Sequence, residues 1–251
     1  MADELTLQST LSRATIPIMN TPQLVYCLLE MKPGATVARG SLPLNLSLVV
    51  DRSGSMSGQK IESLRDATNL VLDMLQPQDY ISIIFFSSRV DVAFPSQQIT
   101  SPAQLSEMKT RISRLSAEGS TKMAPAMEAG LVELRKQMPA GRGGTHVSRL
   151  VLLTDGITEK EKKCLEQADE AAQLGVPITA LGIGKDWNDK LMEEIGKTSG
   201  GDADYISSPD RIRTHFARTV QQMQAVALKN ALLRVRPALG IEVRSVYRVH
   251  P

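Results

Sequence analysis

The chain has little of what several large classes of protein require. Only two of its 251 residues are cysteines, Cys27 and Cys164. They lie far apart and match neither a disulfide framework nor a zinc-binding pattern, which fits a reducing compartment. We expect both to be small, buried hydrophobic residues rather than ligands or cross-links.

Long apolar runs and an excess of charge of one sign are also missing. No run of about 18 apolar residues occurs, and the N-terminus has neither the basic nor the apolar part of a secretion signal. Lys and Arg number 29 against 27 Asp and Glu, spread along the chain, for a net charge of +2. Nucleic acid binding requires a basic field. We therefore predict a soluble, cytoplasmic protein with no nucleic acid partner and no membrane insertion.

The middle of the chain alternates short apolar runs with helical periodicity, which is typical of a doubly wound α/β sheet. We predict five parallel strands at Leu44 to Val50, Tyr80 to Phe86, Leu150 to Leu153, Ile178 to Ile183 and Tyr205 to Ile206. The run at 90–94 follows its predecessor too closely for a helical crossover, so it should form an antiparallel edge strand. Apolar spacings of three and four predict flanking helices near 61–75, 101–115, 127–138, 164–174, 191–195 and 212–223. The glycine-rich stretch 141–144 should be a mobile connector.

The two ends of the chain follow a different pattern. Segments 6–18, 24–31, 231–235 and 241–249 are rich in β-prone residues, are divided by proline and glycine, and show no helical period. Because they flank the α/β region on both sides, the simplest interpretation is an attached β subdomain into which that region is inserted. We predict residues 44–224 as the α/β domain and 1–43 with 225–251 as the subdomain, with further strands expected after Pro251.

Three loops at the predicted strand ends and helix starts carry oxygen-bearing side chains. They are Asp51-Arg52-Ser53-Gly54-Ser55, Gly119-Ser120-Thr121 and Thr154-Asp155-Gly156. Ligands of an open α/β sheet bind beyond the carboxyl ends of its strands, so folding can bring two carboxylates and three hydroxyls together. Hard oxygen ligands in small number suit Mg²⁺, which keeps several of its waters. The loops therefore indicate a metal site.

These residues resemble the metal-ion-dependent adhesion site of the von Willebrand factor type A (vWA) domain, written D-x-S-x-S, then T, then D. Its five positions are filled in order by Asp51, Ser53, Ser55, Thr121 and Asp155. The resemblance covers residues 44–224 and implies a Rossmann-like fold. It implies that the three hydroxyls bind Mg²⁺ directly and the two carboxylates directly or through water, with Mn²⁺ or Ca²⁺ as alternative metals. Lys122 departs from the family, in which asparagine is common at that position.

The resemblance also implies a non-enzymatic interaction module, an adaptor or regulatory subunit, in which a Glu or Asp of a protein partner replaces a metal-bound water. Intracellular prokaryotic vWA proteins are often associated with AAA+ ATPases or with kinase and phosphatase systems, and no residue here selects among them. Because the site should lie on a surface loop, we expect Asp51→Ala or Ser53→Ala to remove binding with little loss of folding. Methionines close in sequence to the ligands form either an apolar rim for the partner or core: Met56, Met123 and Met127.

Two other functions stay open. A Mg²⁺-dependent phosphohydrolase of the haloacid-dehalogenase type also begins with an aspartate at a strand end, but it needs an acid two positions later, where this chain has Ser53. A structural scaffold with an empty site is the third possibility, and the complete ligand set argues against it. Nucleotide binding at Gly196-Lys197-Thr198 is not expected, because Leu191 stands where a phosphate-binding loop needs glycine.

Overall fold

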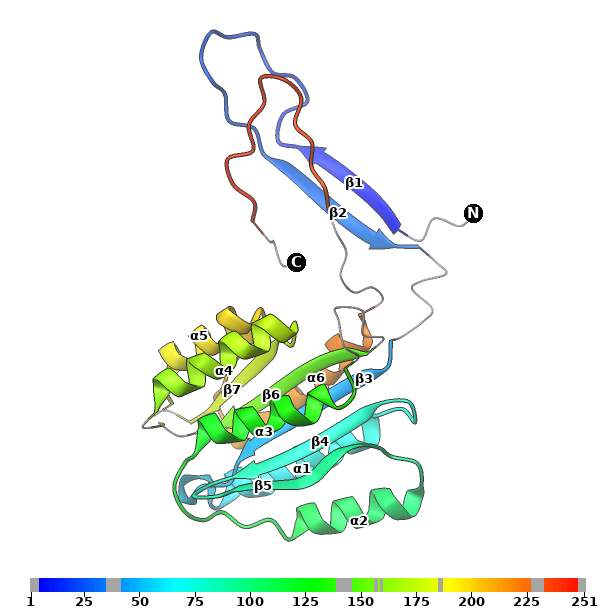
Figure 1. The fold of residues 1–251 in the computed structure, drawn as a ribbon, viewed down its shortest axis with the longest axis vertical. Coiled ribbons are helices and arrows are strands. Elements are labelled where there is room, and N and C mark those ends of the chain that lie inside the picture. The colour runs from blue at the N-terminus through cyan, green and yellow to red at the C-terminus, as the bar shows by residue number, and fades with distance from the viewer. Residues whose placement is uncertain are drawn as a thin grey trace.

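The computed structural model describes residues 5–34, 42–138, 146–155, 158, 160–184, 187–226 and 233–247. These residues form a six-stranded sheet with helices on both faces and a separate two-stranded sheet (Figure 1). The predicted connector at 141–144 lies outside the described residues, as does Gly156 of the third predicted ligand loop.

The six-stranded sheet has the predicted, mostly parallel topology. Its strands are β3 (Leu44–Asp51), β4 (Tyr80–Phe86), β5 (Val90–Gln98), β6 (Val147–Thr154), β7 (Ile178–Ile183) and β8 (Asp202–Ile206), in the order β5-β4-β3-β6-β7-β8. Strand β5 pairs antiparallel with β4 at one edge, and the other neighbouring pairs are parallel. The fold class predicted from the sequence is therefore confirmed.

Each predicted helix is present. The six are α1 (Gln59–Met74), α2 (Pro102–Ser113), α3 (Met123–Arg135), α4 (Glu161–Leu174), α5 (Asp189–Ser199) and α6 (Ile212–Gln224), and two short 3₁₀ turns are η1 (Gly54–Met56) and η2 (Pro209–Arg211). Helix α2 starts as its sequence predicts, because the Ser101 hydroxyl accepts a hydrogen bond from the Gln104 N–H at 3.2 Å and Pro102 occupies the first turn.

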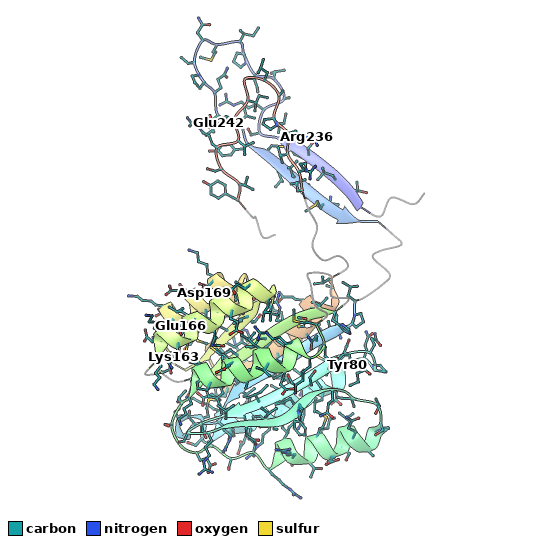
Figure 2. All side chains as sticks on the ribbon, in the orientation of Figure 1. Tyr80, Lys163, Glu166, Asp169, Arg236 and Glu242 are labelled. Atoms are coloured by element: carbon teal, nitrogen blue, oxygen red, sulfur yellow. The ribbon has the colours of Figure 1, made fainter. Side chains whose placement is uncertain are left out.

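The sheet separates two buried apolar layers. Side chains of alternating residues along β3 point to opposite faces, so Leu48 and Val50 pack with α1, α2 and α6, whereas Val49 packs with α3, α4 and α5. The outer side of α4 is polar, and Figure 2 shows Lys163, Glu166 and Asp169 along it. None of the described helices is long and apolar enough to cross a membrane.

The methionines near the ligand loops belong to the core. Met56 and Met127 are fully buried, and Met123 is 1% exposed. The hypothesis of an apolar methionine rim is therefore wrong, because η1 and the first turns of α3 direct these side chains into the two packed layers. Trp187 is also a packing residue: it stacks on Tyr205 and occupies the space that a side chain at Gly182 would fill.

The N-terminal end forms the two-stranded sheet, in which β1 (Leu5–Leu11) pairs antiparallel with β2 (Cys27–Pro33). Alternation places Leu7, Leu11, Cys27 and Met31 on one face, and these side chains are all exposed. The predicted burial of Cys27 is therefore wrong, because β2 is not part of the packed layers. Cys164 is buried as predicted, and burial, with a smaller effect of the Glu161 charge, raises the pKa of its thiol to about 11.

The C-terminal end departs from its predicted pattern. Residues 233–247 contain a turn at Leu239 and Gly240 but no strand, although strands were predicted within 231–235 and 241–249. Apolar side chains there are exposed, with Tyr247 at 79%. β-prone residues alone do not make a strand, because each strand also needs a neighbour to receive its backbone hydrogen bonds. A β subdomain built from both ends of the chain stays a prediction.

Candidate metal centre

The two carboxylates of the site come from neighbouring strands. Asp51 is the last residue of β3, and Asp155 directly follows β6. The two strands are parallel and in register, with Val50 opposite Leu153. Both acids therefore lie at the same edge of the sheet, the one at which ligands of open α/β sheets bind.

Asp51 is fully buried and is held by neutral donors. Its Oδ1 accepts a hydrogen bond from the Ser53 N–H at 2.7 Å, and its Oδ2 accepts one from the Thr154 hydroxyl at 2.6 Å. Burial raises the pKa of Asp51 above its usual value, with a smaller contribution from the charge of Asp155, and the hydrogen bonds from Thr154 and Ser53 offset only part of this effect. A cation beside this carboxylate would stabilise its charged form.

A chain of hydroxyl groups joins the buried part of the site to the surface. The Ser53 and Ser55 hydroxyl oxygens are 3.0 Å apart, and the Ser55 hydroxyl donates to Oδ1 of Asp155 at 2.7 Å. Ser53 is 2% exposed, whereas Ser55 is an exposed residue. The other carboxylate oxygen of Asp155 forms an ion pair with the ammonium group of Lys60. The site therefore opens to solvent at Ser55.

The loop that carries Thr121 is fastened to the first ligand loop by backbone hydrogen bonds. The Gly54 N–H donates to the Gly119 carbonyl at 3.0 Å, and the Glu118 N–H donates to the Arg52 carbonyl at 2.8 Å. Gly119 has a φ of 76°, and a Cβ there would collide with Ser88, so this close approach requires glycine. Hydrogen bonds thus link four predicted ligands, Asp51, Ser53, Ser55 and Asp155, into one cluster. The fifth, Thr121, is half-buried and lies two residues after Gly119 in the loop that is bonded to the first ligand loop.

Sequence reasoning named Thr154 only as part of the third loop, without its bond to Asp51, and it missed Lys60. A signal for Thr154 was its position at the end of a predicted strand, next to Asp155. A signal for Lys60 was a positive charge in the first turn of a helix, where cations are unfavourable. Their partners lie 103 and 95 residues away in sequence, so local spacing could not identify the contacts.

The chemistry of the donors fits a hard divalent cation. Two carboxylates and two hydroxyls contact one another, with no histidine or cysteine among them. No group of three or more His, Cys, Asp or Glu side chains that could hold a metal occurs in the described part of the chain, so a metal here would depend on the hydroxyl oxygens as well as on the two carboxylates. Oxygen donors of this kind match Mg²⁺ and similar ions better than softer metals.

A shallow hollow adjoins the first ligand loop. Within it, the Arg52 guanidinium pairs with the Glu118 carboxylate at 2.7 Å. Arg89 is an exposed residue that lines the hollow. Lys122 is also exposed, and its N–H donates to the carbonyl of Ser87, another residue of the hollow. The hollow is lined by Arg52, Ser87, Ser88, Arg89, Glu118 and Gly119. The surroundings of the site therefore include more basic than acidic groups.

Comparison with known proteins identifies the family of the chain. The family model of the von Willebrand factor type A domain matches residues 45–222. An uncharacterized protein of Synechocystis, sll0103, is 34% identical over 215 residues, which cover 84% of this chain and 49% of that protein.

Two solved structures share the fold. A von Willebrand factor type A protein from Catenulispora acidiphila has a TM-score of 0.68 at 16% identity, covering 89% of this chain and 50% of that one. Proximal thread matrix protein 1 from the mussel byssus, with a zinc-occupied MIDAS motif, has a TM-score of 0.55 at 16% identity, covering 72% and 48%. The chain spans about half the length of these three relatives. It belongs to the von Willebrand factor type A domain family, a module that commonly mediates protein–protein interaction with a metal-ion-dependent adhesion site.

Proposed function

We propose that this chain binds a partner protein through a divalent cation, Mg²⁺, and that it acts as an adaptor or regulatory subunit rather than as an enzyme. The proposed ligands are Asp51, Ser53, Ser55, Thr121 and Asp155. The partner supplies a Glu or Asp side chain to the metal. The observation that carries this proposal is the hydrogen-bonded cluster of two buried carboxylates and two hydroxyls that reaches the surface at Ser55.

The cluster gives each residue a separate task. Asp51 and Asp155 supply negative charge from within the fold, while the hydroxyls of Ser53 and Ser55 supply neutral oxygen donors. A bound Mg²⁺ supplies positive charge and an exchangeable water position at which an outside carboxylate can bind. Zinc in the corresponding motif of the mussel protein supports divalent metal binding, although the choice of Mg²⁺ rests on the donor chemistry alone.

The same contacts argue against the alternative phosphohydrolase. A nucleophilic aspartate must reach its substrate, but Asp51 is fully buried and both its oxygens accept hydrogen bonds. Position 53 also holds a serine that is 2% exposed, so the required acid is missing. In a scaffold without metal, no bound cation would stabilise the charged form of Asp51, which burial disfavours, as the raised pKa of this residue indicates.

Metal-dependent capture tests the proposal. The protein is immobilised and exposed to an extract of its source cells in Mg²⁺, in EDTA, and in EDTA followed by excess Mg²⁺, with Asp51→Asn as the matched variant. The expected result is a captured protein that EDTA releases, that Mg²⁺ restores and that Asp51→Asn does not retain. An AAA+ ATPase, a kinase or a phosphatase would be the first candidates to look for.

Two outcomes would contradict the proposal. Equal capture by Asp51→Asn, or capture that persists in EDTA, would show binding independent of the metal and favour a scaffold. Hydrolysis of p-nitrophenyl phosphate that requires Mg²⁺ and disappears in Asp51→Asn would favour the enzyme. To complete the test, each acidic residue of the captured protein is replaced in turn, and one substitution should abolish binding.

A further inference from the structure

Lys60 brings a positive charge to the metal site. It lies in the first turn of α1, and its ammonium group forms an ion pair with Oδ2 of Asp155. The other oxygen of that carboxylate accepts the hydrogen bond from Ser55. The Asp155 side chain is 1% exposed and that of Lys60 is 28% exposed. The ion pair therefore connects a partly exposed cation to a buried acid of the site.

Apart from the ion pair with Asp155, a lysine at position 60 is unfavourable, because it lies in the first turn of a helix. The free N–H groups at a helix N-terminus carry partial positive charge, which repels a cation. Helix α1 begins after Gly58, and no side chain caps it with a hydrogen bond. The ammonium group lies beside the bend at Gly184, which has a φ of 94°: a Cβ there would lie 3.4 Å from Lys60 Nζ, an ordinary van der Waals contact. Attraction to Asp155 explains why the cation lies there.

We propose that Lys60 sets the charge of the metal site, lowering its affinity for a divalent cation and raising the affinity of the loaded site for a carboxylate. This inference rests on the proposed function. With Asp51 and Asp155 ionised and Lys60 protonated, the three side chains carry a formal charge of −1, which a divalent cation changes to +1. Without the charge of Lys60 the corresponding values are −2 and 0, so the loaded site would not attract an acid by net charge.

Isothermal titration of Mg²⁺ alone into EDTA-treated, dialysed protein tests the first half of the proposal. Lys60→Met keeps most of the length of the side chain and removes its charge. Its Kd for Mg²⁺ should be lower than that of the unmodified protein by about tenfold, because the substitution removes the Coulomb repulsion between the ammonium group and the metal. Lys60→Arg should resemble the unmodified protein. Lys190→Met is the matched control, because Lys190 is the second residue of α5 as Lys60 is of α1, and it is exposed.

Acetate provides a simple carboxylate for the second half. The proteins are loaded with Mn²⁺ to equal occupancy, and paramagnetic broadening of the acetate methyl proton signal reports binding beside the metal. Broadening should be weaker for Lys60→Met than for the unmodified protein and for Lys190→Met. Equal broadening would overturn the proposed effect on the carboxylate.

The outcomes separate this inference from the proposed function. If the unmodified protein binds no divalent cation, the proposed function itself fails. If it binds Mg²⁺ and Lys60→Met binds with equal or weaker affinity, only the role of Lys60 is overturned, and the lysine instead positions Asp155. Should Lys60→Met fail to fold, Lys60→Gln takes the same test, since its amide can still donate to Asp155 without a charge.

Discussion

Asp51 and Asp155 terminate neighbouring strands and are both buried, yet the fold satisfies them in different ways. Asp51 receives hydrogen bonds from two neutral donors, the Ser53 N–H and the Thr154 hydroxyl. Asp155 receives one from the exposed Ser55 and forms an ion pair with the ammonium group of Lys60. The Asp51 side is therefore built into the sheet, whereas the Asp155 side depends on groups that reach solvent.

This difference assigns separate roles to the two halves of the site. Burial raises the pKa of Asp51 and its neutral donors offset only part of this effect, so that side gains most from a cation. The Asp155 side already has the ammonium group of Lys60 and the exposed hydroxyl of Ser55, so substitutions there can change metal affinity without disturbing the core. Substitutions on the Asp51 side should change both stability and metal binding, whereas substitutions on the Asp155 side should change mainly affinity.

The largest expected effect is stabilisation of the folded protein by the metal, because the metal would bind both Asp51 and Asp155. Mg²⁺ at a hundred times its Kd should raise the free energy of unfolding by about 2.7 kcal/mol. For a domain of this size, that corresponds to an increase in Tm of roughly 5–10 °C. Thermal unfolding followed by circular dichroism in EDTA and in Mg²⁺ measures it. An equal increase in the Asp51→Asn/Asp155→Asn double variant would show that the stabilisation arises elsewhere.

On the Asp51 side, Asp51→Ala should lower the free energy of unfolding by about 1–3 kcal/mol in EDTA, because it removes the acceptor of two buried hydrogen bonds. The sequence-based expectation of little loss assumed a surface loop, but Asp51 is fully buried, so we expect a larger loss. Asp51→Asn is the control: its amide oxygen can accept from Ser53, and its amide N–H can donate to the Thr154 hydroxyl. Urea unfolding that gives equal values for the two variants would contradict this assignment.

The same carboxylate should make metal-free stability depend on pH. The folded pKa of Asp51 lies above 3.8, so between the unfolded and folded pKa values the folded protein binds more protons than the unfolded chain. Stability in EDTA should therefore fall as pH rises through this window, and this part of the dependence should be absent in Asp51→Asn. Mg²⁺ affinity should change in the opposite direction, because an ionised ligand binds the metal. Urea midpoints measured across the window for both proteins test the sign, and parallel curves would contradict it.

On the Asp155 side, Ser55→Ala should change the free energy of unfolding least, by about 0.5 kcal/mol or less, because Ser55 is exposed. Its Mg²⁺ affinity should nevertheless be weaker, since the hydroxyl is a proposed ligand bonded to Asp155. Titration calorimetry and urea unfolding on one preparation give both values. Unchanged affinity would remove Ser55 from the ligand set.

The sequence predicted those parts of the molecule that depend on local pattern. The apolar runs that became β3 and β6 are each followed by an aspartate, and the general behaviour of open sheets then placed both acids at one edge. The short spacing after Phe86 likewise predicted the antiparallel β5. In each case, the information lies within about ten residues.

The remaining features depend on contacts between distant segments. No local pattern joins Lys60 to Asp155 or Thr154 to Asp51, since packing of α1 and β6 against the site creates those contacts. Burial of Met56 was equally ambiguous, because methionine suits both cores and interfaces. The β-prone residues of segment 241–249 predicted a strand, but residues 241–247 contain none, because a strand also requires a partner that local sequence does not specify.

Locating a bound cation tests the central claim most directly. Mn²⁺ is added in small amounts to ¹⁵N-labelled protein, and paramagnetic broadening of amide signals is measured residue by residue. The signals of residues 51–55, 118–122 and 155 should broaden first, those of β1 and β2 should keep their widths, and excess Mg²⁺ should reverse the broadening. Broadening centred on another part of the chain, or none at Mn²⁺ concentrations that saturate other proteins of this family, would contradict a metal site formed by Asp51 and Asp155.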